Sequence, residues 1–326
     1  MQLRRLGSTG FVIPPLVFGG NVFGWTINEK ESFTILDALY DNCLVAIDTA
    51  DVYSSWAAGN QGGESETIIG NWLTKHSIAR DKLVIFTKVG ADLGSPGKRG
   101  LSAQWIIKAV EDSLRRLQTD YIDIYFSHWP DINTPYEETL NAYLKLLTTG
   151  KIRAIGASNL NARQLRTALE VADSQRLPRY QVLQPEYNIY DRTAFDDKLK
   201  KLCIEENIGV VTYYSLASGF LTGKYRRQSD LNSSARKSDI DKYLNQRGEK
   251  ILNALQVVAD DQQATLAEVA LAWLMAFNGI TAPIASATTV AQVESFVKAI
   301  NLTLTKAQFE YIDSEIKLKI FLYLSN

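Results

Sequence analysis

The chain has 326 residues, 46% of them hydrophobic and 22% charged, so it can bury a large core and does not have the composition of a disordered protein. Its formal net charge of -1 gives no argument for binding nucleic acid or an acidic lipid surface. The richest apolar run, 266–277, is too short to cross a membrane and contains Glu268. Cys43 and Cys203 lack metal-site or CxxC spacing, and the polar N-terminus does not resemble a signal peptide. We therefore expect reduced core thiols and a cytoplasmic protein.

The chain begins with a predicted hairpin, residues 2–6 and 11–13, joined by a Gly7-Ser8-Thr9-Gly10 turn. A short apolar strand over 16–20 and a helix over 30–42 follow, and from there strands and helices alternate. The expected strands are 44–48, 83–87, 121–126, 152–157, 181–183, 208–212 and 280–285. The expected helices are 64–75, 102–117, 135–148, 161–174, 193–206, 245–260, 265–277 and 289–299, with a long polar loop over 222–244.

This alternation predicts one domain over residues 1–326 and an α/β fold. The strands are short and almost wholly apolar, as expected of parallel strands that are covered on both faces. Eight such units favour a (β/α)8 TIM barrel with an N-terminal β-hairpin and extra C-terminal helices over a doubly wound sheet. A doubly wound dinucleotide-binding fold should also show GxGxxG after an early strand, and the sequence contains no such motif there.

Polar residues stand where the predicted strands end. In a barrel these carboxyl ends meet on one face, which is where barrel enzymes carry their active sites. A turn or a packed polar group explains one or two such residues but explains seven poorly. The residues are Asp48, Lys88, His128, Ser158, Gln184, Tyr214 and Ser286.

The stretch from Ala46 to Tyr53 carries an acid and a phenol: Asp48 closes a buried strand and Tyr53 follows five positions later. On this stretch alone, a turn aspartate and an interface tyrosine explain the pattern equally well. Together with Lys88 and His128, however, the two form a group able to transfer a proton. A lysine ammonium about 4 Å from the phenol would lower the tyrosine pKa from about 10 toward neutrality. His128 would orient a carbonyl or assist the proton transfer, unless it is a buried core histidine.

The sequence fits a metal-dependent enzyme or a serine hydrolase poorly. Two distant histidines, His76 and His128, and two unsuited cysteines do not make a zinc centre, so no metal site is expected. The sequence has no GxSxG nucleophile elbow. Acid–base chemistry on a carbonyl remains, and the spacing of the residues does not say whether a hydride donor takes part.

The chain resembles the aldo-keto reductase superfamily from Leu3 to about Asp313. It is most similar to the bacterial branch that is related to potassium-channel β subunits. The resemblance rests on Phe18-Gly19-Gly20, Ile47-Asp48-Thr49-Ala50-x-x-Tyr53, Gly62-Gly63-Glu64-Ser65-Glu66, Thr87-Lys88, Asp123-x-x-x-x-His128-Trp129-Pro130, Gly150-Lys151-Ile152-Arg153-x-x-Gly156-x-Ser158-Asn159, Gln184-x-x-Tyr187-Asn188 and Gly219-Phe220-Leu221-Thr222-Gly223-Lys224-Tyr225.

The resemblance implies a barrel that binds NADP(H), with NAD(H) as the alternative, and reduces aldehydes or ketones. It implies that Tyr53 is the general acid, that Asp48 and Lys88 tune it, and that His128 positions the carbonyl. Trp25, Trp56 and Trp129 are candidates for an aromatic substrate pocket or for simple packing. The cofactor-binding residues it implies are Gly20, Asn21, Asp48, Ser158, Asn159, Gln184, Tyr214, Ser215, Leu216, Ser218, Gly219, Lys224, Ser286, Thr288 and Gln292.

Two features depart from the family pattern. Thr288 and Phe296 stand where the family usually has an Arg and an Asn of its last nucleotide-binding motif, so the usual basic contact to a 2′-phosphate is not expected there. Lys224, Arg226 and Arg227 of the polar loop could reach a phosphate, although a solvated loop face explains the two arginines at least as well. The tail over 316–326 alternates like a strand and would pack on the barrel, bind a partner or be an irregular end. A cofactor-binding, redox-sensing subunit with slow turnover is the main alternative to a reductase, because both would share the same four residues.

Overall fold

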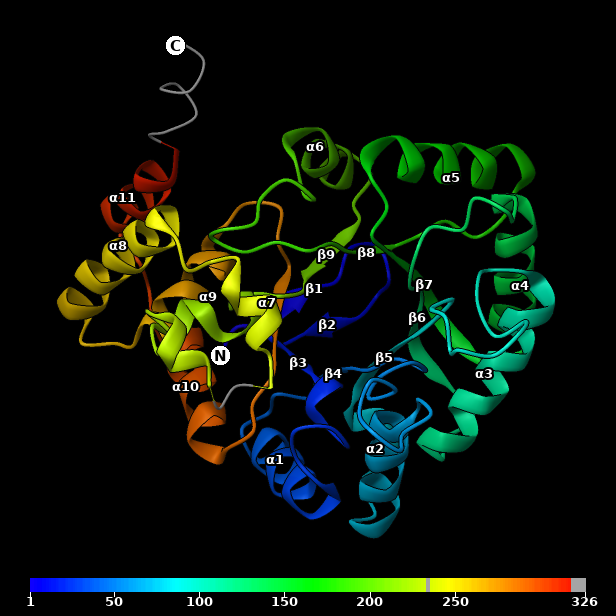
Figure 1. Ribbon diagram of the computed structural model, residues 1–326. Helices are drawn as coiled ribbons and strands as arrows, with labels where there is room; N and C mark the ends of the chain where they lie inside the picture. Colours follow the sequence, from blue (N-terminus) through cyan, green and yellow to red (C-terminus); the bar gives the residue numbers. More distant parts are fainter. Residues whose placement is uncertain (233–234, 318–326) are drawn as a thin grey trace.

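The computed structural model of the protein describes residues 1–232 and 235–317. Eight parallel strands close into a barrel with helices around it (Figure 1). The order around the barrel is β10-β3-β4-β5-β6-β7-β8-β9, so strands that follow one another in the chain are neighbours, and the last pairs with the first. The strands are β3 (Val17–Gly19), β4 (Ala46–Asp48), β5 (Val84–Val89), β6 (Ile122–Ser127), β7 (Ile152–Ser158), β8 (Val182–Gln184), β9 (Gly209–Thr212) and β10 (Ala282–Ala285).

Helices cover the outside of the barrel, and further helices lie in the C-terminal part of the chain. Those that follow strands β3 to β8 are α1 (Glu29–Asp41), α2 (Glu64–Lys75), α3 (Ala103–Leu117), α4 (Tyr136–Thr148), α5 (Ala162–Gln175) and α6 (Asp197–Glu205). The remaining ones are α7 (Lys237–Asp241), α8 (Gln246–Gln262), α9 (Leu266–Ala276), α10 (Val290–Asn301) and α11 (Lys306–Lys317). None of the helices among the described residues is long and apolar enough to cross a membrane.

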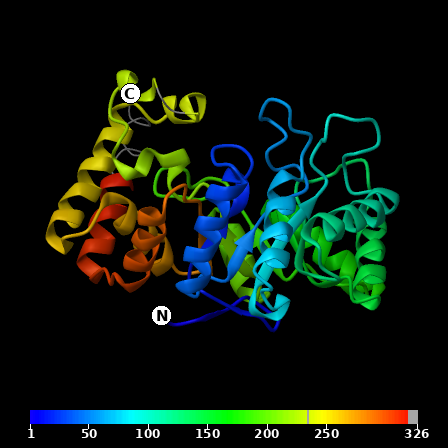
Figure 2. The same cartoon turned by 90° about the horizontal axis from the view of Figure 1, so that it is seen from below.

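A two-stranded hairpin, β1 (Arg4–Arg5) with β2 (Val12–Ile13), lies at the end of the barrel opposite the long loops (Figure 2). Leu6 and Ile13 of this hairpin are fully buried and join the apolar cluster inside the barrel, which also holds Phe86 and Phe126. The strands leave no space there: a Cβ on Gly156 would lie 2.4 Å from the Phe126 ring. One end of the barrel is therefore plugged, and the other is left for a site.

The structure confirms the predicted barrel, hairpin and C-terminal helices. The helix predicted over 64–75 has these bounds, and Ser102 caps α3 by accepting a hydrogen bond from the Trp105 N–H. Helix α6 starts four residues later than the predicted helix over 193–206, because the Asp196 carboxylate caps it by accepting from the Leu199 N–H.

Three expectations need correction. The polar loop over 222–244 is not wholly irregular, since it contains a 3-10 turn (Gln228–Leu231) and α7. Cys43 is exposed in the turn after α1 and is not a core thiol, whereas Cys203 is buried in α6. The strand-like tail was predicted to begin at 316, but residue 316 belongs to α11; residues 318–326 lie outside the described residues.

Candidate active site

Strands β4 and β5 bring an acid, an ammonium and a phenol together at the open end of the barrel. The Lys88 Nζ donates to Asp48 Oδ2 at 2.7 Å, to the Thr49 carbonyl at 2.8 Å and to the Tyr53 hydroxyl at 2.9 Å. The Tyr53 hydroxyl in turn donates to Asp48 Oδ2 at 3.1 Å. The other carboxylate oxygen accepts from Gln184 Nε2 at 2.8 Å. Asp48 and Lys88 are almost wholly buried, so the ion pair is shielded from water, and four further hydrogen bonds fix it.

The electrostatics of Tyr53 differ from the sequence prediction. Burial, followed by the Asp48 carboxylate, raises the pKa of Tyr53 well above its ordinary value of 10. Burial also lowers the pKa of Lys88, against the opposing effect of Asp48. The prediction that Lys88 brings the tyrosine pKa toward neutrality is therefore wrong. The phenol keeps its proton at neutral pH and is present in the form that a general acid requires.

His128 follows β6 and faces the phenol. Its ring lies 6.1 Å from the Tyr53 ring, edge to face, and stacks on Trp129. Burial, with a contribution from Lys88, lowers the pKa of His128 well below 6.5, so the imidazole is neutral. Its Nδ1 is buried and has no hydrogen-bond partner within the described part of the chain. A neutral imidazole beside the proton donor can orient a carbonyl, and this placement favours that role over a satisfied core histidine.

An amide network continues from the ion pair across the ends of β7, β8 and β9. The Ser158 hydroxyl donates to the Gln184 carbonyl at 2.7 Å, and Asn159 Nδ2 donates to the Ser158 hydroxyl and the His128 carbonyl. The Tyr213 hydroxyl donates to Asn159 Oδ1 at 2.8 Å. This network holds three of the predicted cofactor residues in fixed orientations, and Tyr213 is a member that the sequence analysis missed.

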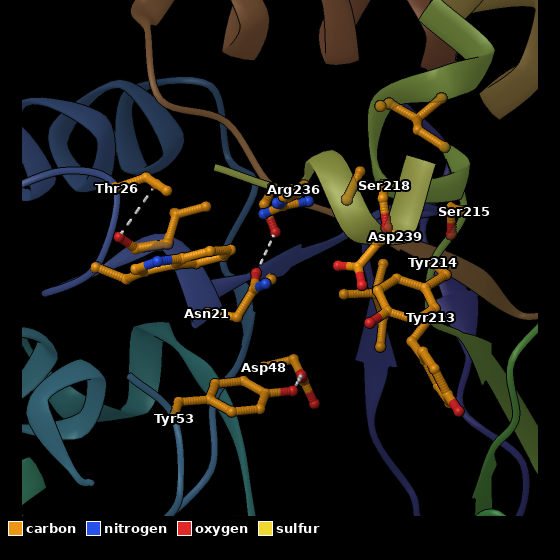
Figure 3. Close-up of a pocket in the computed structure, with 18 of the residues that line it drawn as sticks. Asn21, Thr26, Asp48, Tyr53, Tyr213, Tyr214, Ser215, Ser218, Arg236 and Asp239 are labelled. Carbon is orange, nitrogen blue, oxygen red and sulfur yellow. Dashed lines mark hydrogen bonds between the residues drawn. The ribbon is translucent and has the colours of Figure 1, made fainter. Parts of the chain in front are cut away.

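These groups line one large cavity of about 1210 Å³ at the open end of the barrel. The cavity is lined by most of the residues predicted for the site, several of which Figure 3 shows around it. Two predicted residues do not border it. Lys88 lies beneath Tyr53, and Gly20 turns its carbonyl to the Ser65 hydroxyl, while Gly19 borders the cavity instead. A Cβ on Gly19 would lie 2.7 Å from the Ser286 hydroxyl and 3.1 Å from an Ile284 methyl carbon, so a larger residue there would displace side chains at the floor of the cavity.

The far side of the cavity combines an aromatic platform with an unusual backbone turn. Tyr214 is 41% exposed, and the ring of Tyr213 packs beside its ring at 5.3 Å between centroids. Ser218 and Gly219 have positive φ values of 56° and 101°, a left-handed conformation that brings the main chain to the cavity surface. Ser215, Leu216 and Lys224 line the same side.

Thr288, one of the two residues that depart from the family pattern, lines the side of the cavity next to α10. The Thr288 N–H and hydroxyl both donate to Gln292 Oε1, at 2.7 and 3.3 Å, and the Ser286 hydroxyl donates to Asn21 Oδ1. Phe296 is buried in the core and contributes nothing to this surface. Of the three loop cations expected here, only Lys224 lines the cavity, whereas the Arg226 guanidinium donates to Gln256 on α8. Arg236 lines the cavity as well, which the sequence did not suggest.

Aromatic rings surround the phenol on the remaining side. Trp25 and Trp56 meet edge to face at 5.5 Å, and Trp56 packs against Tyr53 at 6.0 Å. Trp56 and Trp129 are each 49% exposed, although they are large apolar side chains. All three tryptophans line the cavity, so they do not serve as core packing alone.

A comparison with protein families gives one result that agrees with this geometry. The model of the aldo/keto reductase family matches residues 15–317. The chain belongs to this family. It is 33% identical to the uncharacterized oxidoreductase YrpG of Bacillus subtilis over 94% of this chain and 93% of that protein. It is 31% identical to a probable voltage-gated potassium channel subunit beta of Arabidopsis thaliana, over 93% of this chain and 92% of that one. The aldo-keto reductase AMT2 of Alternaria alternata is 29% identical over 96% and 91%.

Family membership makes the protein an aldo-keto reductase-type oxidoreductase. In the part of the chain that the structure describes, no group of three or more His, Cys, Asp or Glu residues is placed to hold a metal ion. The cavity is larger than the 300–1,000 Å³ typical of small-molecule sites.

Proposed function

We propose that the protein reduces an aldehyde or ketone to the alcohol by hydride transfer from NADPH, with Tyr53 as the general acid. The observation that carries this proposal is the hydrogen-bonded group of Asp48, Lys88 and Tyr53 at the floor of the cavity, with neutral His128 opposite. Tyr53 can donate a proton, Lys88 can stabilise the phenolate that remains, and His128 can orient a carbonyl. All three act at the same point of the cavity. Hydrolysis would need a nucleophile, and this group supplies a proton instead.

The residues fit a nicotinamide dinucleotide. Gln184 uses its amide nitrogen on Asp48, so its amide oxygen remains to accept from a carboxamide, beside Ser158 and Asn159. Tyr214 offers an exposed ring face on which a flat heterocycle can stack. The backbone at Ser218 and Gly219, with Lys224, suits a pyrophosphate. The cofactor would supply the hydride to the carbonyl carbon.

The protein's own task is to deliver the proton. The Tyr53 hydroxyl turns its hydrogen from Asp48 Oδ2 to the carbonyl oxygen as that oxygen gains negative charge. The phenolate that forms stays 2.9 Å from the Lys88 ammonium, which stabilises it only after the proton has left. Asp48 keeps this ammonium charged in a buried place. The hydride and the proton together convert the carbonyl into the alcohol.

The substrate would lie among the three tryptophans. Trp56 packs on Tyr53, and Trp129 stacks on His128, so both flank the point where the carbonyl must lie. Binding an apolar substituent there would cover the exposed halves of both rings. The proposal therefore favours carbonyl compounds with an apolar or aromatic substituent.

The direct test follows NADPH absorbance with a panel of aldehydes, ketones and sugars, each at several concentrations. The proposal expects consumption of NADPH that depends on a carbonyl compound, with one mole of alcohol formed per mole of NADPH. Absence of turnover across the panel, by protein that binds NADPH tightly, would contradict it.

A second candidate is a cofactor-binding regulatory subunit with slow turnover. It is favoured by the 31% identity to the Arabidopsis protein described as a probable potassium channel subunit beta, and by 30% identity to one so described in Oryza sativa. The same four residues serve both functions. A partner protein that co-purifies in fixed stoichiometry, together with negligible turnover on every carbonyl tried, would favour this candidate.

A further inference from the structure

Two residues at the start of α2 contact the strands that carry the ion pair, but from the outer face of the barrel. Ser65 and Glu66 are both fully buried. Ser65 accepts a hydrogen bond from the Thr49 hydroxyl at 2.8 Å, and Glu66 Oε1 accepts one from the Thr87 hydroxyl at 2.5 Å. Consecutive residues of one helix therefore hold two threonines on neighbouring strands.

The two threonines are the immediate neighbours of the catalytic pair. Thr49 follows Asp48, and Thr87 precedes Lys88. Because side chains alternate along a strand, Thr87 points outward to α2 while Lys88 points to the open end of the barrel. The Thr49 carbonyl is also one of the three acceptors of the Lys88 ammonium. A shift of either threonine would therefore move an atom of the catalytic group.

Both helix residues are themselves fixed from the other side. The Ser65 hydroxyl donates to the Gly20 carbonyl at 2.8 Å, which joins α2 to the end of β3. Glu66 Oε2 accepts from Arg116 Nε at 2.7 Å, which joins α2 to α3. Glu66 also lies in the first turn of α2, where the helix dipole favours a carboxylate. The carboxylate is thus held at both oxygens, although it is buried.

We propose that Ser65 and Glu66 are positioning residues for the proton-transfer group, and that they act by fixing Thr49 and Thr87 so that Lys88 stays within hydrogen-bond distance of both Asp48 and Tyr53. A catalytic group must be held to within a fraction of an ångström, and a misplacement of about 1 Å costs about 100-fold in rate. The Glu66 charge adds a second effect, since it favours the ammonium form of Lys88.

The sharpest variant is Thr87→Val, which removes the hydroxyl and keeps the shape of the side chain. The first test measures turnover, and in that test the inference rests on the proposed function. The kcat for carbonyl reduction should fall about tenfold in Thr87→Val and in Glu66→Gln, while the KM for the carbonyl and the Kd for NADPH stay within about twofold of wild type. Thr87→Ser, which restores the hydroxyl, should recover most of the rate. A loss of packing alone would not be rescued by serine, which is smaller than valine.

Thr139→Val is the matched control. Thr139 is an equally buried threonine whose hydroxyl donates to the Leu101 carbonyl at 3.0 Å, away from the ion pair. It should lose thermal stability to a similar extent as Thr87→Val while its kcat stays within about twofold of wild type. A fall in kcat of the same size in both variants would mean that the effect is general loosening of the fold.

A readout without turnover separates this inference from the proposed function. The Lys88 ammonium, buried and bonded to three acceptors, can be followed by NMR in protein labelled with 15N at the lysine side chains. Its Nζ–H resonance, assigned with Lys88→Met, should shift or broaden in Thr87→Val and Glu66→Gln but not in Thr139→Val. If wild-type protein reduces no carbonyl, the proposed function fails and the resonance still decides the positioning role. An unchanged Lys88 resonance in both variants would overturn the inference.

Discussion

Replacing Lys88 by Met tests whether the Lys88 ammonium stabilises the phenolate of Tyr53. In wild-type protein the ammonium lies 2.9 Å from the Tyr53 hydroxyl. At an effective dielectric constant of about 20, a unit charge at that distance stabilises a phenolate by about 6 kcal/mol. Because this attraction exists only after the proton has left, its loss should appear in kcat, and about 6 kcal/mol corresponds to about four decades of rate.

The measured decrease in kcat should be somewhat smaller than this, because water that enters the space left by the lysine side chain can partly stabilise the phenolate. We therefore expect kcat to fall by about 10³- to 10⁴-fold in Lys88→Met, with the Kd for NADPH little changed. Stopped-flow absorbance of NADPH in a single turnover measures the step, and quenching of tryptophan fluorescence measures the Kd. Lys201→Met, which removes an exposed lysine paired with Glu205 on α6, should leave kcat within about twofold of wild type. A Lys88→Met protein that retains a tenth of wild-type kcat would refute the reasoning.

Four further predictions concern the pH dependence of activity, the pH dependence of stability, the cofactor and the stereochemistry. Because burial and Asp48 raise the pKa of Tyr53, carbonyl reduction should not decline between pH 7 and about pH 9 through loss of the tyrosine proton. A kcat/KM profile that falls with an apparent pKa near 7, together with an absorbance titration that shows a tyrosinate forming at the same pH, would contradict this. The lowered pKa of His128 means that the unfolded chain binds this proton first, so stability should fall as pH drops below about 6.5, and His128→Asn should flatten that fall in thermal denaturation. The ratio of NADPH affinity to NADH affinity should be about one to two decades smaller than in relatives with an Arg at the position of Thr288. Thr288→Arg should tighten the binding of NADPH and leave that of NADH little changed. An unchanged Kd for NADPH would mean that the 2′-phosphate does not lie beside residue 288. Hydride should leave the pro-R face of the nicotinamide because Tyr214 would cover the other face, and transfer of a pro-S deuterium label would exclude that arrangement.

The fold was predictable because each of its parts has a local signal. Apolar strands that end in Asp48, Lys88 or Gln184 repeat at regular spacing, and this pattern specifies both the barrel and the end at which its polar residues gather. Boundaries that depend on a single cap, such as the start of α6 at Asp196, were less accurate. The exposed position of Cys43 depends on a turn with positive φ just after α1, which the apolar pattern of that region did not indicate.

The members of the site were also largely predictable, whereas their electrostatics were not. A sequence shows that Asp48 and Lys88 lie near strand ends and that Tyr53 follows Asp48 closely, but not that burial and the nearby Asp48 carboxylate raise the pKa of the phenol. Contacts between distant segments carry no local signal either. The Tyr213 hydroxyl on Asn159 and the Glu66 carboxylate on Arg116 join residues 54 and 50 positions apart, so only the folded chain reveals them.

The measurement that tests the central claim most directly is the turnover of Tyr53→Phe. This variant removes the phenol hydroxyl and leaves the ring, the ion pair of Asp48 with Lys88, and the residues around Gln184 in place. We predict that it reduces no carbonyl at a measurable rate while it binds NADPH nearly as tightly as wild-type protein does. Wild-type turnover by Tyr53→Phe would contradict the account and would make His128 the next residue to test as the proton donor.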